Sequence, residues 1–234
     1  GTLQQSEELM KKARCLGWCI EWLQAYFLVA DDVMDSSSMR RGQPCRYRQP
    51  GVGLIAINDA LLLRSSIDLL LESEFNGPKL QALKSLFSEV ERDTQMGQLL
   101  DLTMNWEELM ASSGSSMHKY YQMVQYKTAI YSFYLPFACA AVLLDSTLPA
   151  EARDISLQLG TLFQVQDDVL DVFGDPQITG KVGTDIEEGK CTWLFCRLLE
   201  KNLANDDHDT LYDSYGKAEG VKSIESVYRK YNLQ

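Results

Sequence analysis

The sequence is short of several features that would point to particular classes of protein. It holds only two histidines, and its 33 acidic residues outnumber its 22 basic ones, which gives a formal net charge of −11. A protein that binds nucleic acid normally presents a basic face, so this charge argues against that class. An acidic chain can still bind an anionic ligand when divalent cations lie between the two.

Long apolar runs and strand-like alternation are also missing. The richest apolar stretch, 129–144, is shorter than the ~18 residues of a membrane span, and Tyr131, Ser132 and Tyr134 interrupt it. The sequence therefore predicts no transmembrane segment. The chain begins at Gly1 with neither a basic leader nor a signal-type apolar core, so we expect a trimmed segment. The compartment we expect is the cytoplasm, with the mitochondrion as the alternative.

Cysteines are too sparse for a disulfide framework. Six of them, at positions 15, 19, 45, 139, 191 and 196, are spread over 234 residues. This pattern is typical of reduced thiols. A zinc site built from Cys15, Cys19, Cys191 and Cys196 is the alternative, but the short gaps within helical stretches favour buried thiols.

Apolar residues at helical spacing dominate the chain, as in the series Leu16, Ile20, Leu23 and Phe27. Turn-forming residues around positions 50, 77, 147 and 175 divide it. We expect helices over 2–36, 51–72, 79–104, 116–144, 150–173 and 185–201. Several of these are too long and apolar for a thin surface layer. The sequence therefore predicts an all-α bundle, one domain over 1–234, with its site between the helices.

The strongest motif is Asp31-Asp32-Val33-Met34-Asp35, which directly follows the apolar run 25–30. On a helix, Asp31 and Asp35 lie one turn apart on the same face, with Asp32 beside them. Three like charges so close at the end of an apolar helix repel one another unless a cation neutralises them. The motif therefore indicates a cation site.

The same pattern returns at Asp167-Asp168-Val169-Leu170-Asp171, and 167 − 31 = 136 residues separate the copies. A solvated helix end would explain one copy, but two copies in apolar surroundings favour carboxylates that face each other. A donor set made only of oxygen suits Mg²⁺, which combines carboxylates with phosphate oxygens of a substrate.

The residues around both motifs closely resemble farnesyl diphosphate synthases, in the short-chain trans-prenyl diphosphate synthase family. The likeness is carried by 26–37 and 40–43 at the first motif, 163–168, 171, 173–176, 179–181 and 183–186 at the second, and 97–102 and 126–136 between them. It extends to about Trp193 and is vaguer beyond. It implies an isoprenoid-synthase helical bundle with a central cavity. It also implies that family segments at both ends are missing, including part of the isopentenyl diphosphate site.

The activity implied by this resemblance is Mg²⁺-dependent head-to-tail condensation of isopentenyl diphosphate with dimethylallyl and geranyl diphosphate to give farnesyl diphosphate. The allylic diphosphate ionises, isopentenyl diphosphate attacks the carbocation, and the released diphosphate takes the proton. The family also implies a homodimer and three Mg²⁺ ions per site, which Mn²⁺ can replace. The alternatives are a geranyl diphosphate synthase, a non-catalytic partner subunit of a prenyl synthase, and a class I terpene cyclase.

The resemblance also assigns roles to individual residues. The metal set comprises Asp31, Asp35 and Asp101 on one side of the allylic diphosphate, Asp167, Asp171 and Asp185 on the other, and Asp32 and Asp168 supporting them from behind. The residues expected to bind substrate are Gln24, Arg40, Arg41, Gln98, Lys127, Thr128, Gln164, Lys181 and Lys190. Guanidinium forks and ammonium groups suit phosphate oxygens.

Two smaller groups complete the expected site. Lys127, Thr128 and Gln164 are the expected catalytic residues, because the two oxygen-bearing side chains would face the nascent carbocation. Tyr26 and Phe27, five and four positions before Asp31, would form the floor of the cavity and stop chain growth early. Ordinary core packing is the alternative for these two rings. Two adjacent rings favour a fifteen-carbon product, with ten carbons as the next choice.

Overall fold

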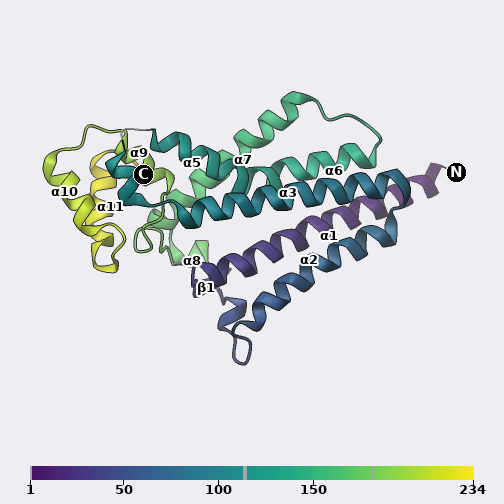
Figure 1. The fold of residues 1–234 in the computed structure, drawn as a ribbon, viewed down its shortest axis with the longest axis horizontal. Helices are drawn as coiled ribbons and strands as arrows, with labels where there is room; N and C mark the ends of the chain where they lie inside the picture. Colours follow the sequence, from purple (N-terminus) through teal and green to yellow (C-terminus); the bar gives the residue numbers. More distant parts are fainter. Residues whose placement is uncertain (1, 113–114, 181) are drawn as a thin grey trace.

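A computed structural model of the chain describes residues 2–112, 115–180 and 182–234. The long helices α1 (Thr2–Met34), α2 (Ile55–Glu74) and α3 (Gly77–Thr103) lie along the long axis of the bundle (Figure 1). The short helices α9, α10 and α11 gather at the end opposite the N-terminus. The all-α bundle expected from the helical spacing is confirmed.

The second half of the chain supplies the rest of the bundle. Its elements are α4 (Trp106–Ala111), α5 (Ser116–Val124), the π-helix η2 (Gln125–Tyr134), α6 (Leu135–Leu143), α7 (Ala150–Phe173), α8 (Pro176–Thr179), α9 (Trp193–Leu199), α10 (Asn205–Ser214), η3 (Ala218–Gly220) and α11 (Val221–Lys230). Between α1 and α2, the short strands β1 (Met39–Arg40) and β2 (Gln43–Pro44) pair antiparallel ahead of a 3₁₀ turn, η1 (Arg46–Arg48).

One predicted helix, 185–201, is wrong in its first half, because helix α9 begins only at Trp193. The stretch before it is turn and loop, in which Gly189 adopts φ +67° and packs against the indole of Trp106. Thr192 then caps the helix, since its side chain accepts a hydrogen bond from the backbone N–H of Phe195 at 3.3 Å. A glycine followed by a threonine that can cap a helix indicates that the helix begins after them, although the apolar residues around them have helical spacing.

Two separate apolar clusters hold the bundle together. One joins α1, α2, α3 and α6 through residues such as Leu23 and Phe87, and the other joins α5, α9, α10 and α11 through residues such as Tyr120 and Phe195. All six cysteines are free thiols, and Cys191 and Cys196 lie in the second cluster while Cys19 lies in the first. This separation removes the zinc alternative. Among the described residues, no helix is both long and apolar enough to cross a membrane.

The π-helix η2 is held closely from two sides by helices that carry glycine at the contact. A Cβ on Gly97 of α3 would lie 2.1 Å from the backbone nitrogen of Lys127. A Cβ on Gly160 of α7 would lie 2.3 Å from the Cβ of Ala129. Only glycine permits such backbone approach. Because π-helical turns are wide and uncommon, this packing fixes an unusual register at Lys127 and Thr128.

We expect Gly160→Ala to lower the free energy of unfolding by about 1–3 kcal/mol, because its new methyl group would overlap Ala129. The matched control is Gly17→Ala in α1, where a Cβ meets nothing within 4 Å. That change should stabilise the protein by ~0.5–1 kcal/mol through helix propensity. Urea denaturation of both variants checks this, and equal effects would contradict the close packing of η2.

Candidate active site

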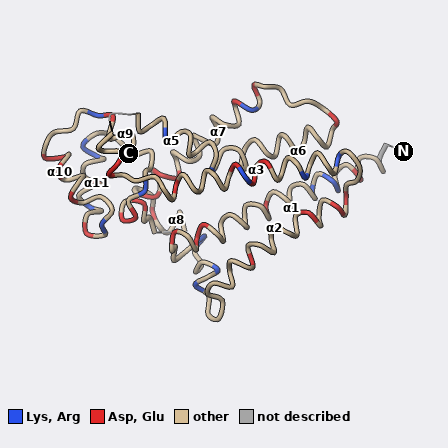
Figure 2. The backbone as a smooth tube through the Cα atoms, viewed as in Figure 1, with Lys and Arg blue, Asp and Glu red and all other residues tan. Residues whose placement is uncertain are grey.

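A cavity of about 640 Å³ opens between α1, α3, η2 and α7, a size typical of small-ligand sites. Acidic residues gather around the place where α1 ends near α8 (Figure 2). Most of the predicted site residues line the cavity, namely Gln24, Tyr26, Phe27, Asp31, Asp35, Arg40, Arg41, Gln98, Asp101, Lys127, Thr128, Gln164, Asp167, Asp168, Asp171, Asp185 and Lys190. Asp32 lies behind this surface, and Lys181 is outside the described residues.

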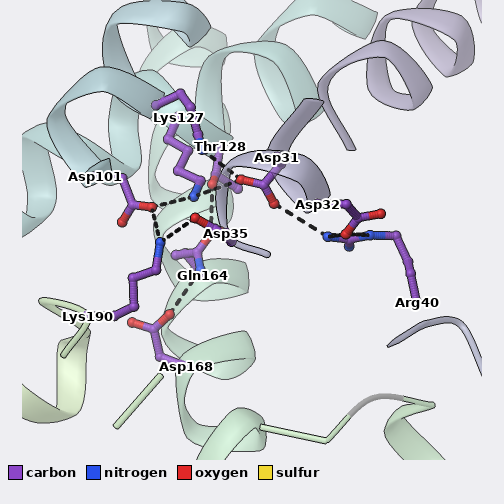
Figure 3. A network of polar contacts seen from close by, with 11 residues as sticks. Asp31, Asp32, Asp35, Arg40, Asp101, Lys127, Thr128, Gln164, Asp168 and Lys190 are labelled. Atoms are coloured by element: carbon purple, nitrogen blue, oxygen red, sulfur yellow. Dashed lines mark hydrogen bonds and ion pairs between the residues drawn. The ribbon is translucent and has the colours of Figure 1, made fainter. Parts of the chain in front are cut away.

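Two lysines and three carboxylates form the centre of one wall (Figure 3). The ammonium nitrogen of Lys127 lies 2.7 Å from Asp101 Oδ2 and 3.5 Å from Asp31 Oδ1. That of Lys190 lies 2.8 Å from Asp35 Oδ1 and 3.2 Å from Asp101 Oδ2. These contacts bring together residues from α1, α3, η2 and the loop before α9. The most distant pair in the sequence, Asp35 and Lys190, is 155 positions apart.

The ionisation of this cluster follows from its charges. Burial alone would raise the pKa of Asp101, but the ammonium groups of Lys127 and Lys190 outweigh it and hold the pKa below its ordinary 3.8. Burial would lower the pKa of Lys127, yet Asp101 and Asp31 raise it above its ordinary value. The carboxylate of Asp101 and the ammonium group of Lys127 are therefore both charged at neutral pH.

Asp35 behaves differently from Asp101. Burial and the nearby charge of Asp31 raise its pKa, although Lys190 opposes both effects. At Asp35, burial and the charge of Asp31 together outweigh the opposing effect of Lys190. Further cationic charge would favour the ionised form of Asp35, so the donors fit a divalent metal ion.

The middle aspartate of the first motif has a separate partner. Asp32 is only 3% exposed, and its Oδ1 accepts a hydrogen bond from Arg40 Nε at 2.8 Å. Arg40 also lies 3.4 Å from Asp31 Oδ2, so its guanidinium is held at the edge of the cavity. Asp32 thus lies behind the cavity surface, where its carboxylate orients Arg40.

The hairpin that carries the arginines turns at Arg41 and Gly42, whose φ angles are +53° and +74°. Positive φ at both central residues is the signature of a two-residue hairpin, and a non-glycine residue there is uncommon. The backbone N–H of Gly42 donates to the carbonyl of Gly180 at 2.8 Å, which ties the hairpin to the loop after α8. Arg41 is exposed and lines the cavity.

The second motif also has a buried middle aspartate. Asp168 accepts hydrogen bonds from Tyr120 Oη at 2.8 Å, from the backbone N–H of Trp193 at 2.7 Å and from Gln164 Nε2 at 2.9 Å. Burial raises its pKa to about 6 despite these donors. Because the Gln164 amide group is oriented by Asp168, its Oε1 accepts from Thr128 Oγ1 at 2.7 Å. The pair Thr128 and Gln164 is thus fixed at the cavity surface.

The outer aspartates of the second motif face the cavity with Asp185. Asp171 Oδ2 accepts a hydrogen bond from the backbone N–H of Asp185 at 3.0 Å. Within 2–112, 115–180 and 182–234, no three carboxylate, thiol or imidazole groups already surround a single point as a metal cage would. Mg²⁺ commonly takes one or two carboxylates and completes its shell with phosphate oxygens and water, so these donors fit it.

Three contributors to the site were not predicted from the sequence. Tyr120 and the backbone N–H of Trp193 hold Asp168, but neither belongs to an aspartate motif. A tyrosine at helical spacing is usually core packing, and a backbone donor leaves no trace in composition. Gln95 of α3 also lines the cavity and donates to Tyr26.

The fold and the site together define an all-α bundle in which two aspartate motifs line one cavity. The family model for polyprenyl synthetase matches residues 1–231. The chain belongs to the polyprenyl synthetase family, whose members are prenyltransferases.

Within that family, the similar proteins are farnesyl diphosphate synthases. Farnesyl diphosphate synthase 1 of Artemisia spiciformis is 48% identical over 242 residues, covering 100% of this chain and 68% of that protein. Farnesyl pyrophosphate synthase 1 of Lupinus albus is 50% identical over 230 residues, covering 95% of this chain and 66% of that protein. The chain thus spans about two thirds of the length of these relatives.

The fold is also similar to solved structures of farnesyl diphosphate synthases. A T. brucei farnesyl diphosphate synthase complexed with a bisphosphonate superposes with a TM-score of 0.92 at 35% identity, covering 99% of this chain and 69% of that one. The risedronate complex of the T. brucei enzyme superposes with a TM-score of 0.91 at 34% identity, covering 99% and 70%.

We expect Asp101→Asn to lower the free energy of unfolding of the metal-free full-length protein by about 3 kcal/mol at pH 7, because Lys127 loses its closest carboxylate. The folded pKa of Asp101 is depressed, so its contribution is fully present above 3.8 and is lost as the pH falls through the lower folded value. The difference between wild type and variant should therefore shrink below pH 3.8.

Urea denaturation between pH 7 and pH 3 measures this difference. The matched control is Glu89→Gln, an exposed acidic residue on the same helix, which should change stability little at any pH. A pH-independent effect of Asp101→Asn would show that the ion pairs do not stabilise the fold.

Proposed function

We propose that this chain is the catalytic core of an enzyme that condenses isopentenyl diphosphate with dimethylallyl and geranyl diphosphate to give farnesyl diphosphate, with Mg²⁺ required. The observation that carries the proposal is that both aspartate motifs, Lys127 and Lys190 line one cavity. Relatives named farnesyl diphosphate synthase support the choice of product.

The metal would be held by carboxylates from opposite walls of the cavity, namely Asp31, Asp35 and Asp101 on one and Asp167, Asp171 and Asp185 on the other. When bound, Mg²⁺ acts as a Lewis acid on the leaving diphosphate, so that its departure needs no proton. Burial and the charge of Asp31 raise the pKa of Asp35, and a bound cation would favour the ionised form of this carboxylate. Mn²⁺, which also takes oxygen donors, is expected to substitute.

Basic side chains of the chain complete the diphosphate site. Lys127 and Lys190 each have an ammonium group inside the cavity, and Arg40 presents a guanidinium that Asp32 holds in place. Guanidinium and ammonium donors stabilise the charge that develops on a departing diphosphate. Arg41, exposed at the hairpin turn, would reach isopentenyl diphosphate, with Gln24 and Gln98 orienting the substrates.

The hydrogen-bonded pair of Thr128 and Gln164 would stabilise the carbocation through its oxygens. Asp168 fixes the amide of Gln164, so that neither side chain has to reorganise when positive charge develops. Such preorganised dipoles are effective in a cavity from which water is excluded. The diphosphate that has just left would accept the proton.

Product length would be set by the aromatic floor. The rings of Tyr26 and Phe27 have centroids 4.9 Å apart, and Phe27 contacts Tyr131 of η2 at 5.5 Å. From the 1.5 Å rise of a helix, Tyr26 lies about 7.5 Å along α1 from Asp31. This short distance supports an early stop to chain growth. The product we propose has fifteen carbons, with the ten-carbon geranyl diphosphate as the alternative.

The test is a product assay on the full-length protein with Mg²⁺, dimethylallyl diphosphate and isopentenyl diphosphate, with products identified after phosphatase treatment. We expect farnesol as the product, and no product when the metal is chelated. The rate of Asp35→Asn should be lower than that of wild type by roughly 100-fold. The exposed control Glu89→Gln should keep the wild-type rate.

Other results of the same assay decide between the alternatives. Geraniol alone would indicate a geranyl diphosphate synthase, and a hydrocarbon formed without isopentenyl diphosphate would indicate a terpene cyclase. Diphosphate binding without any product would indicate a non-catalytic partner subunit and overturn the proposal.

The proposal includes a homodimer, supported by apolar side chains exposed along one face of α2. Ile55, Leu62 and Leu69 recur at intervals of seven residues and are 57%, 57% and 66% exposed. An apolar stripe on a long helix normally packs against a partner. Analytical ultracentrifugation of the full-length protein should give twice the mass of one chain, and a single-chain mass at micromolar concentration would contradict it.

A further inference from the structure

We propose that Gln95 of α3 is a positioning residue that holds the ring of Tyr26 across the cavity and thereby limits the length of the product. This inference rests on the proposed prenyl-transfer function and adds a residue on a second helix to the floor. Product length is then limited by the hydrogen bond between Gln95 and Tyr26 as well as by the bulk of the Tyr26 and Phe27 rings.

The contact joins two helices at the cavity surface. Gln95 Nε2 donates to Tyr26 Oη at 3.0 Å, and both residues line the cavity. The residues are 69 positions apart in sequence, one on α1 and the other on α3. The ring of Tyr26 therefore has Phe27 on one side, and its hydroxyl is bonded to the exposed Gln95 at the far end.

Gln95 is itself held in place. The second hydrogen of the same amide group reaches Glu91 Oε1 at 3.1 Å, one turn earlier on α3. Glu91 forms an ion pair with Arg64 of α2, and Arg64 also contacts Asp68 at 3.2 Å. A polar chain thus runs from α2 through α3 to the hydroxyl of Tyr26. Its donors and acceptors match, which orients the Gln95 amide toward the ring.

The two floor residues differ in what restrains them. Phe27 is wedged between the rings of Tyr26 and Tyr131, with centroids at 4.9 and 5.5 Å. Tyr26 is half-buried, and aromatic side chains move between staggered rotamers when nothing holds the ring. The bond from Gln95 selects the rotamer that crosses the cavity. Without it, the ring can swing aside and admit a longer chain.

The experiment uses variants that remove the hydrogen bond without removing bulk. Gln95→Leu keeps the side-chain volume, and Tyr26→Phe keeps the ring, so neither opens space by itself. In the full-length protein with excess isopentenyl diphosphate, we expect each to raise the ratio of twenty-carbon to fifteen-carbon product about fivefold, the population shift that one hydrogen bond supplies. The double variant should show no further increase, because both changes break the same contact.

Two further variants make the result decisive. Gln81→Leu, an exposed glutamine on the same helix, is the matched control and should leave the product ratio unchanged. Tyr26→Ala with Phe27→Ala removes the floor itself and should lengthen the product more than Gln95→Leu does. The rate of forming geranyl diphosphate should be the same in wild type and in the Gln81→Leu control.

The outcomes separate the inference from the function on which it rests. If the double alanine variant makes longer products and Gln95→Leu and Tyr26→Phe do not, the role of Gln95 is overturned while the proposed function stands. Additive effects of Gln95→Leu and Tyr26→Phe would also overturn it. If wild type makes no prenyl product, the proposed function fails, and the inference fails with it.

Discussion

The structure depends on the cost of placing many carboxylates around one partly buried cavity. Repulsion between these groups would open the bundle unless positive charge compensates it. Lys127 and Lys190 supply part of that charge, and the depressed pKa of Asp101 shows their effect. At Asp35, burial and the charge of Asp31 raise the pKa despite the nearby lysines. We propose that divalent cations, bound together with an anionic substrate, supply further positive charge to these carboxylates.

The rest of the fold serves to hold this charge cluster in place. Gly97 and Gly160 allow α3 and α7 to approach η2 closely, and so fix where Lys127 and Thr128 face. The middle aspartate of each motif has its own hydrogen-bond donors and does not contact Lys127 or Lys190. Asp32 accepts from Arg40, and Asp168 accepts from the backbone N–H of Trp193. Each aspartate motif therefore combines cavity-facing acids with one acid that orients a neighbouring side chain.

Much of this arrangement could be predicted from the sequence, because it depends on local periodicity. The apolar spacing predicts the long helices, and the one-turn separation of Asp31 and Asp35 predicts that they share a face. The loop 185–192 was missed because Gly189 and Thr192 interrupt a stretch whose apolar residues still have helical spacing. Contacts between distant segments, such as Tyr120 with Asp168 or Gln95 with Tyr26, depend on tertiary packing that no local pattern encodes.

We propose that the carboxylates bind metal jointly with a diphosphate rather than alone. Isothermal titration of the full-length protein with Mg²⁺, with and without an unreactive allylic diphosphate analogue, tests it most directly. The account predicts weak Mg²⁺ binding alone, tight binding with the analogue, and an equal gain in analogue affinity when Mg²⁺ is present, because linkage is reciprocal. Mg²⁺ affinity that does not change when the analogue is added would contradict it.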